Sequence, residues 1–306
     1  MMASGATTAI RSAETLAALR ALAAGERSLS VRCSDRYARH FLARGTRTLF
    51  DLAPRAVLKS VIEHAAPGSY CFAIARTRHF DQALLAAIDA GAQQLVLLGA
   101  GYDSRAFRFE SELARVRVFE VDHPGTQARK TQILADRIGR LPENLELISC
   151  DFNRQSLSDE LARRGFKPEL RTIFLWEGVS YYLPQAAIDA VLTFVAKCAP
   201  GSGVVFDYAL SSFVAGDTST YGGSQVARWL KNIGEPFLFG LDAGEATSFL
   251  ARHGLHVVSD LGPADLERRY LATTRDGSLG RTLGHVRIAH AQTAESGAPS
   301  QQGERP

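Results

Sequence analysis

The segment from residue 95 to residue 109, LVLLGAGYDSRAFRF, constrains the fold more than any other part of the chain. Four consecutive apolar residues lead into Gly99-Ala100-Gly101, and a polar stretch with Asp103 and Ser104 follows. This order predicts a buried strand, a glycine turn and the start of a helix, which is where α/β proteins hold nucleotide-like ligands. The glycines let the backbone approach a ligand closely, because they carry no Cβ.

The alternation of strand and helix continues beyond this segment. Apolar strand-like runs lie at 117–121, 145–149, 172–176 and 204–208, and helix-like segments lie at 104–114, 124–138, 155–164 and 185–198. Strands joined by helices of this length form a parallel sheet with helices on both faces. Right-handed crossovers then place the carboxyl ends of the strands at one edge. We therefore predict an α/β fold with a Rossmann-like, mostly parallel sheet.

The regions that flank this pattern differ from it in composition. Residues 1–90 are rich in Ala, Leu and Arg and have no clear strand, so we expect a helical cap region with helices at 12–25, 34–43, 54–65 and 78–90 and a turn at Pro67-Gly68. The main domain is expected at 91–290 and closes with a helix at 243–253 and strands at 255–260 and 282–290. The polar tail at 291–306 is predicted to be disordered. The glycine-rich part of 211–240 is either a cover over the site or a surface connection.

Composition and charge exclude several other classes of protein. The formal net charge is only +3 and the basic residues are scattered, which argues against nucleic-acid binding. No apolar run approaches the ~20 residues that cross a bilayer, and charges come too early for a signal peptide. The four cysteines are far apart, which predicts free thiols in a cytoplasmic protein. Neither CxxC nor HExxH occurs, so we expect no metal site.

Acidic residues follow the predicted strands that come after the glycine turn. Glu120 and Asp122 end the second strand, Asp151 and Phe152 follow the third, and Glu177 follows the fourth. Because the strand ends share one edge of the sheet, we expect these side chains to converge on one crevice.

A dinucleotide fits such a crevice poorly. Ser104 stands where the third glycine of the GxGxxG pattern belongs, and Asp103, which we otherwise expect to cap the next helix, would face a pyrophosphate with like charge. S-adenosylmethionine has no phosphate, and acids attract its sulfonium cation. Asp122 or Glu120 could accept from the ribose hydroxyls and Asp151 from the adenine amine, with the ring of Phe152 alongside. These residues favour S-adenosylmethionine.

Four segments of the chain, LGAGYDSRAFR, FEVDHP, CDF and LWEGVSYYLP, resemble the leucine carboxyl methyltransferase family over residues 30–210. That family includes phosphatase carboxyl methyltransferases and bacterial polyketide carboxyl methyltransferases. The resemblance implies a class I methyltransferase sheet and S-adenosylmethionine as cofactor. It also implies O-methylation of a carboxylate on a small molecule, such as a polyketide or other natural product of secondary metabolism, or on a peptide.

The resemblance further implies a role for each matching residue. Arg76 would hold the carboxylate of the cofactor, with Arg78 as the alternative because the spacing to the glycine turn is two residues shorter than in the family. The other implied cofactor contacts are Gly99, Ala100, Gly101, Asp122 for the ribose, Asp151 and Phe152 for the adenine, and Glu177 beside the sulfonium. Tyr182 would lie near the acceptor, which makes Arg76 and Tyr182 the candidate catalytic residues.

Other functions stay open from the sequence alone. A carboxylate acceptor is favoured because it is ionised at neutral pH, whereas a phenol or hydroxyl acceptor needs a base that no motif histidine provides. An NAD-dependent oxidoreductase and an inactive binding protein of the same fold are the further alternatives. The expected partner is a small-molecule or peptide carboxylate, with neither nucleic acid nor membrane involved.

Overall fold

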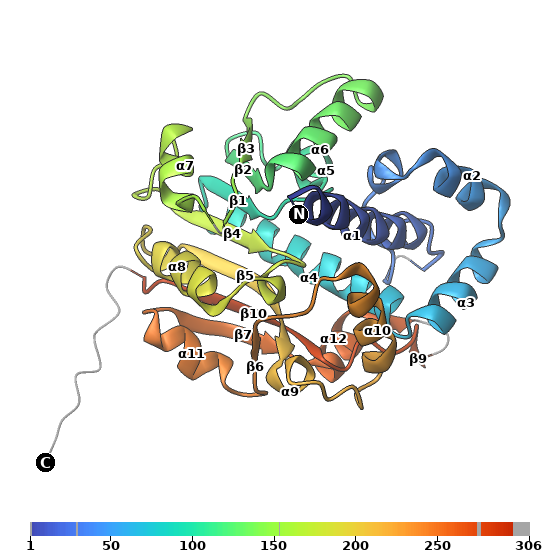
Figure 1. Ribbon diagram of the computed structural model, residues 1–306. Helices are drawn as coiled ribbons and strands as arrows, with labels where there is room; N and C mark the ends of the chain where they lie inside the picture. Colours follow the sequence, from blue (N-terminus) through green and yellow to red (C-terminus); the bar gives the residue numbers. More distant parts are fainter. Residues whose placement is uncertain (1, 29, 153, 274–276, 296–306) are drawn as a thin grey trace, which may run out of the picture.

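A central eight-stranded sheet organises the computed structural model, which describes residues 2–28, 30–152, 154–273 and 277–295 (Figure 1). Its strands are β1 (Gln94–Leu98), β2 (Arg117–Asp122), β3 (Leu145–Ser149), β4 (Thr172–Trp176), β5 (Gly203–Leu210), β6 (Gly240–Leu241), β7 (His256–Leu261) and β10 (Val286–Gln292). They lie in the order β3-β2-β1-β4-β5-β10-β7, with β6 paired to β5. Two short strands, β8 (Ala272–Thr273) and β9 (Gly277–Ser278), pair separately.

The pairing in this sheet is mostly parallel, as the sequence predicts. β1 pairs in parallel with both β2 and β4, and β2–β3 and β4–β5 are also parallel. β10 is antiparallel to β5 and to β7. The strand order reverses between β1 and β4, and open α/β sheets bind ligands outside the strand carboxyl ends at such a point.

Helices cover both faces of the sheet (Figure 1). They are α1 (Met2–Ala23), α2 (Arg44–Leu52), α3 (Arg55–Ala65), α4 (Ser69–Asp89), α5 (Arg105–Arg108), α6 (Pro124–Arg137), α7 (Leu157–Arg163), α8 (Gln185–Ala196), α9 (Ser211–Val214), α10 (Gly223–Ile233), α11 (Ala246–Arg252) and α12 (Pro263–Tyr270). Side chains of α7, α8 and α11 pack on one face with Val96, Phe174 and Phe206. Those of α1, α4, α6 and α12 pack on the other with Leu95 and Leu175. Alternate residues of each buried strand thus point to opposite faces of the sheet and belong to two different apolar layers.

The expected helix at 34–43 is wrong, because the chain forms only the short 3-10 helix η1 (Ala38–Phe41) there. The carboxylate of Asp35 accepts hydrogen bonds from the backbone N–H groups of Tyr37 and Ala38 at 3.1 and 2.9 Å. An aspartate bonded to the backbone two and three residues ahead favours a turn over a helix. The sequence pattern also missed α2 and α12.

Other element boundaries move by several residues. The expected turn at Pro67-Gly68 is confirmed, and α4 begins directly after it at Ser69 rather than at 78. The helix expected at 104–114 shrinks to the four residues of α5. The last strand is displaced from 282–290 to Val286–Gln292, two residues into the expected tail, and residues 296–306 of that tail lie outside the described part.

The N-terminal helices share a core with the main domain. One apolar cluster contains side chains from the N-terminal region, residues 1–90, and from the main domain that follows it. Among them are Leu22 of α1, Phe80 of α4 and Leu97 of β1. All four cysteines are free and buried. Along the described helices, none is at once long and apolar enough to cross a membrane.

A fully buried ion pair fixes α6 on the sheet. The Nζ of Lys130 on α6 lies 2.5 Å from Oε2 of Glu120 on β2, and both side chains have no exposed surface. Burial raises the pKa of the Glu120 carboxyl, although Lys130 opposes the shift. A buried pair of this kind stabilises little in net terms, because both charges lose their hydration.

We expect Glu120→Leu alone to lower the free energy of unfolding by about 3–5 kcal/mol, because it leaves the Lys130 ammonium buried without a counter-charge. The double variant Glu120→Leu/Lys130→Met should recover most of that loss, because it removes both buried charges. Urea denaturation of the two variants measures the difference. Equal destabilisation in both would show that packing volume, rather than the unpaired charge, sets the cost.

Candidate functional site

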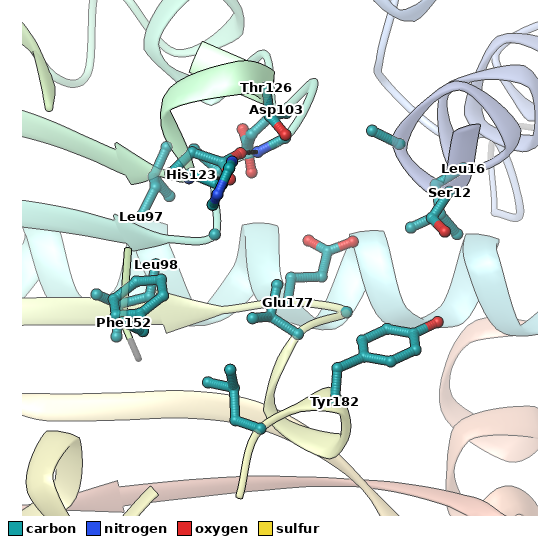
Figure 2. Close-up of a pocket in the computed structure, with 18 of the residues that line it drawn as sticks. Ser12, Leu16, Leu97, Leu98, Asp103, His123, Thr126, Phe152, Glu177 and Tyr182 are labelled. Carbon is teal, nitrogen blue, oxygen red and sulfur yellow. Dashed lines mark hydrogen bonds between the residues drawn. The ribbon is translucent and has the colours of Figure 1, made fainter. Parts of the chain in front are cut away.

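A cavity of about 660 Å³ opens at the carboxyl ends of β1 to β4. Each strand end contributes to its lining: residues 97–103 after β1, Asp122 and His123 after β2, residues 150–152 after β3, and 177–179 after β4. Figure 2 shows Phe152, His123 and Glu177 around this space, with Ser12 and Leu16 of α1 facing them. The strand ends therefore converge as predicted, and α1 closes the far side.

The glycine turn forms part of the lining of this cavity. Gly99 has φ +64°, and a Cβ there would collide with the side chain of Val179. A larger residue at Gly99 would thus strain the backbone and displace the loop after β4. Gly101 also has a positive φ, of +48°. Its backbone N–H donates to Asp122, which ties the turn to the end of β2.

The structure distinguishes the two acids at the end of β2. Asp122 lines the cavity, and its carboxylate accepts from the N–H groups of Gly101 and His123 at 2.5 and 2.6 Å. Burial raises the pKa of Asp122, although these N–H groups oppose the shift. Glu120 does not line the cavity, because it points to Lys130 beneath α6.

The residues after β3 lie at the opposite side of the cavity from α1. Asp151 and Phe152 both line it and are partly exposed. The backbone N–H of Asp151 donates to the side chain of Gln155 at 2.9 Å. An acid and an aromatic ring therefore lie together where the sequence placed them.

Glu177 brings a charged carboxylate to the cavity from the end of β4. Its Oε1 lies 3.1 Å from Nε of Arg76, and its Oε2 lies 2.8 Å from an Nη of Arg105. Burial acts to raise the pKa of Glu177, but the guanidinium groups of Arg105 and Arg76 hold this pKa below its usual value. Glu177 is therefore ionised at neutral pH.

Arg76 does not line this cavity, and its implied role at the cofactor carboxylate stays a prediction. Its guanidinium lies between Glu177 and Asp207 of β5, with 2.7 Å to the Asp207 carboxylate, and it lines a different, smaller cavity. Two acids, one on each side, hold it there. The alternative, Arg78, lines neither cavity and donates to the backbone oxygen of Arg32.

Arg105 on α5 is the centre of a wider buried ion-pair network. It contacts Asp81 of α4 at 2.8 Å and, besides Glu177, the carboxylate of Asp103. Asp103 also accepts from the backbone N–H of Arg105 at 2.7 Å, but the N-cap residue of α5 is Ser104 and not Asp103 as expected. Arg105 and its neighbours hold the pKa of Asp103 at about 2 despite its burial.

This network extends to the N-terminal helix. Asp81 also binds Arg108 at 2.7 Å, Arg108 lies 3.9 Å from Asp35, and Asp35 binds Arg20 of α1 at 2.9 Å. Arg20 lines the larger cavity and donates to the backbone oxygen of Tyr102 at 2.7 Å. Within the network, five carboxylates face four guanidinium groups.

A second cavity of about 340 Å³ adjoins the first. It is mostly apolar, and its lining comes from α1, α3, α4, α10 and the residues before β10. Ser12, Leu16, Gly178 and Tyr182 line both cavities, so the two meet there. Burial raises the pKa of the Tyr182 phenol, which is therefore a neutral hydrogen-bond donor at this junction.

The segment 211–240 contributes to both cavities. Glu235, Pro236 and Leu238 line the larger one, and Trp229 and Phe237 line the smaller. Its backbone is attached to the junction, because the backbone N–H of Leu238 donates to the backbone carbonyl oxygen of Tyr181 at 2.6 Å. The segment is thus a wall of the site, although Tyr221 lies apart and donates to Glu63.

Sequence reasoning missed several residues of the site. Arg20 and Asp207 lie outside the sequence motifs, and Arg105 lies within LGAGYDSRAFR but was given no role there. Asp207 nevertheless stands out as the only charge in the apolar strand VVFDYAL. A charge in such a strand needs a buried partner. In the described part of the chain, no group of three or more His, Cys, Asp or Glu side chains is arranged to hold a metal.

Comparison with known families matches residues 13–196 to the model of leucine carboxyl methyltransferase. The chain belongs to this family. The resemblance carried by the four sequence segments is thereby confirmed.

Individual relatives agree with this assignment. A protein of Bacillus subtilis, YktD, is 30% identical over 66% of this chain and 67% of its own length. A protein of Parafrankia is 42% identical over 43% of this chain and 42% of its own length. Both are provisionally named S-adenosyl-L-methionine-dependent methyltransferases. The aligned parts thus span about two thirds of one relative and less than half of the other.

Solved structures share the fold. A crystal structure described provisionally as a methyltransferase from Thermobifida fusca has a TM-score of 0.57 at 17% identity and covers 91% of this chain and 94% of its own. A DUF574 family protein from Streptomyces avermitilis has the same TM-score at 14% identity, with 91% and 97% covered. The α/β fold class is therefore confirmed.

We expect Arg105→Leu to destabilise the protein by about 3–5 kcal/mol at pH 7, because three buried carboxylates lose their shared cation. The difference in free energy of unfolding between the parent protein and Arg105→Leu should become smaller as the pH falls from 7 to 5. Without the guanidinium the buried carboxyls take up protons in this range, whereas in the parent protein the pKa of Asp103 is about 2 and that group stays ionised. Urea denaturation across this pH range measures the effect.

The matched control is Arg140→Leu, which removes the exposed partner of Glu110. Exposed pairs contribute little, so we expect a change within about 0.5 kcal/mol at either pH. A deficit for Arg105→Leu that is independent of pH would contradict the electrostatic explanation.

Proposed function

We propose that this protein is an S-adenosylmethionine-dependent O-methyltransferase that converts the carboxylate of a small, largely apolar molecule to its methyl ester. The observation that carries the proposal is the pair of adjoining cavities. One is acid-lined at the strand ends, the other is apolar, and they meet at Tyr182. S-adenosylmethionine is the cofactor, and the names of the relatives state it for them.

The residues of the larger cavity fit this cofactor. Asp122 would accept from the ribose hydroxyls, and Asp151 and Phe152 would hold the adenine. Gly99, Ala100 and Gly101 leave room for close backbone approach. Glu177 would lie beside the cation, and its ionised carboxylate favours a positive ligand. Arg20, rather than Arg76, lines this cavity, is only 11% exposed and could bind the carboxylate end.

The cofactor supplies an activated methyl group when bound, and the protein needs mainly to orient the acceptor toward it. Proximity and orientation can contribute roughly 7–11 kcal/mol to such a step. The neutral phenol of Tyr182 lies at the junction, where it could donate a hydrogen bond to the acceptor. Arg76 would position Glu177 from behind and form part of the acceptor wall.

A carboxylate acceptor suits these surroundings because it needs no base. Its pKa of ~4 leaves it ionised at neutral pH. The apolar walls of the smaller cavity strip water from the acceptor, which makes a carboxylate more reactive. The restricted volume of about 340 Å³ favours a small molecule over a folded protein surface.

We expect Asp122→Ala to weaken the binding of S-adenosylhomocysteine at least tenfold, because the ribose hydroxyls lose their acceptor. Isothermal titration calorimetry measures the affinity. The control, Asp136→Ala, removes an exposed acid of α6 that lines neither cavity and should bind normally. Unchanged affinity in Asp122→Ala would exclude its role at the ribose.

We further expect that S-adenosylmethionine with a labelled methyl group labels apolar carboxylic acids, and that mild base releases the label as methanol. A methyl ester is hydrolysed by base, whereas an aryl methyl ether is not. Incubation with a matched panel of carboxylic acids and phenols separates the two. Base-stable label on the phenols, with none on the acids, would contradict the carboxylate proposal and establish a hydroxyl acceptor.

A further inference from the structure

His285 contributes an imidazole to the otherwise mostly apolar smaller cavity. It stands just before β10, lines this cavity and has no exposed surface. Its ring stacks on Phe213, with 3.9 Å between the ring centres and 15° between the planes. Its Nδ1 lies 3.4 Å from Oγ1 of Thr220. The ring is therefore held in one orientation from two sides.

The other nitrogen of this ring, Nε2, is buried without a hydrogen-bond partner. Leaving such an atom unpaired costs stability, because it loses its hydrogen bonds to water. Burial lowers the pKa of His285 to about 4, so the imidazole is neutral at pH 7. A neutral imidazole can donate or accept a hydrogen bond at Nε2, depending on its tautomer.

His285 lies away from the point where methyl transfer is proposed. A row of contacting rings leads from the junction to His285. The distances between ring centres are 5.1 Å from Tyr182 to Phe237, 5.7 Å from Phe237 to Phe213, and 3.9 Å from Phe213 to His285. His285 does not line the larger cavity. It is therefore placed to contact the body of an acceptor rather than the reacting oxygen.

We propose that His285 determines specificity, because its Nε2 hydrogen-bonds an oxygen on the body of the acceptor, remote from the carboxylate that is methylated. The acceptor class is an apolar carboxylic acid with a hydroxyl or carbonyl group along its chain. This inference rests on the proposed function and adds a second recognition point to it. A site built to pair a polar group discriminates strongly against analogues that lack the group.

The test compares decanoic acid with hydroxydecanoic acids that carry the hydroxyl at successive positions. Calorimetry measures their binding to the protein saturated with S-adenosylhomocysteine, so the result does not depend on turnover. The parent protein should bind at least one hydroxylated acid about tenfold more tightly than decanoic acid. His285→Phe keeps a ring against Phe213 and should abolish this preference while its affinity for decanoic acid is retained.

Thermal unfolding of His285→Phe provides a second readout. Because the substitution removes an unpaired buried nitrogen, we expect a melting temperature equal to or above that of the parent. The matched control is His290→Phe on β10, whose Nε2 is also buried and unpaired but which lines neither cavity. This control should leave the preference for the hydroxylated acid unchanged.

Three results would overturn the proposal: no preference in the parent protein, an unchanged preference in His285→Phe, or an equal loss for both kinds of acid. Base-labile label, measured on the same acids, tests the proposed function separately. Ester formation with an unchanged preference in His285→Phe overturns the role of His285 and leaves the carboxyl methyltransferase in place. A preference lost in His285→Phe, without ester from any acid, supports recognition by His285 and contradicts carboxyl transfer.

Discussion

The buried guanidinium of Arg105 is the interaction on which the site depends. It joins α4, the glycine turn and the end of β4 through Asp81, Asp103 and Glu177. Buried ion pairs add little net stability, because each charge loses its hydration on folding. The apolar layers on both faces of the sheet must therefore supply the stability. What the network supplies is position, since each charge has a defined neighbour on a different element.

One consequence is that the two cavities have different electrostatic character although they share a wall. Glu177 faces the larger cavity, and Arg76, bound to it from behind, faces the smaller. Asp207 balances the other side of Arg76 at 2.7 Å. The positive charge of Arg76 is thus offset by two acids before any ligand arrives. An acid-lined chamber and a nearly neutral one can lie side by side for this reason.

The sequence predicts the parts of this arrangement that arise from local pattern. The apolar runs locate β1 to β5 within one or two residues, and the positions after them locate Gly99, Asp122, Asp151 and Glu177 on one cavity. Local sequence pattern does not predict the structure where a contact with a residue distant in sequence determines the conformation. Asp35 turns the chain at 37–38 while it binds Arg20. Similarly, Arg76 occupies a helix position that suits a cofactor contact, but its direction depends on Asp207, 131 residues away.

The neutrality of the smaller cavity determines how a carboxylate acceptor could be bound there. Because Asp207 and Glu177 already occupy Arg76, this residue can attract a substrate carboxylate only weakly. Most of the binding free energy must then come from burial of the apolar body of the acceptor, at about 25 cal/mol per Å². Binding energy gained far from the reacting atoms can offset the cost of stripping water from the carboxylate. On the proposed function, a truncated acceptor would therefore lose transfer rate as well as affinity, because its shorter body contributes less of that energy.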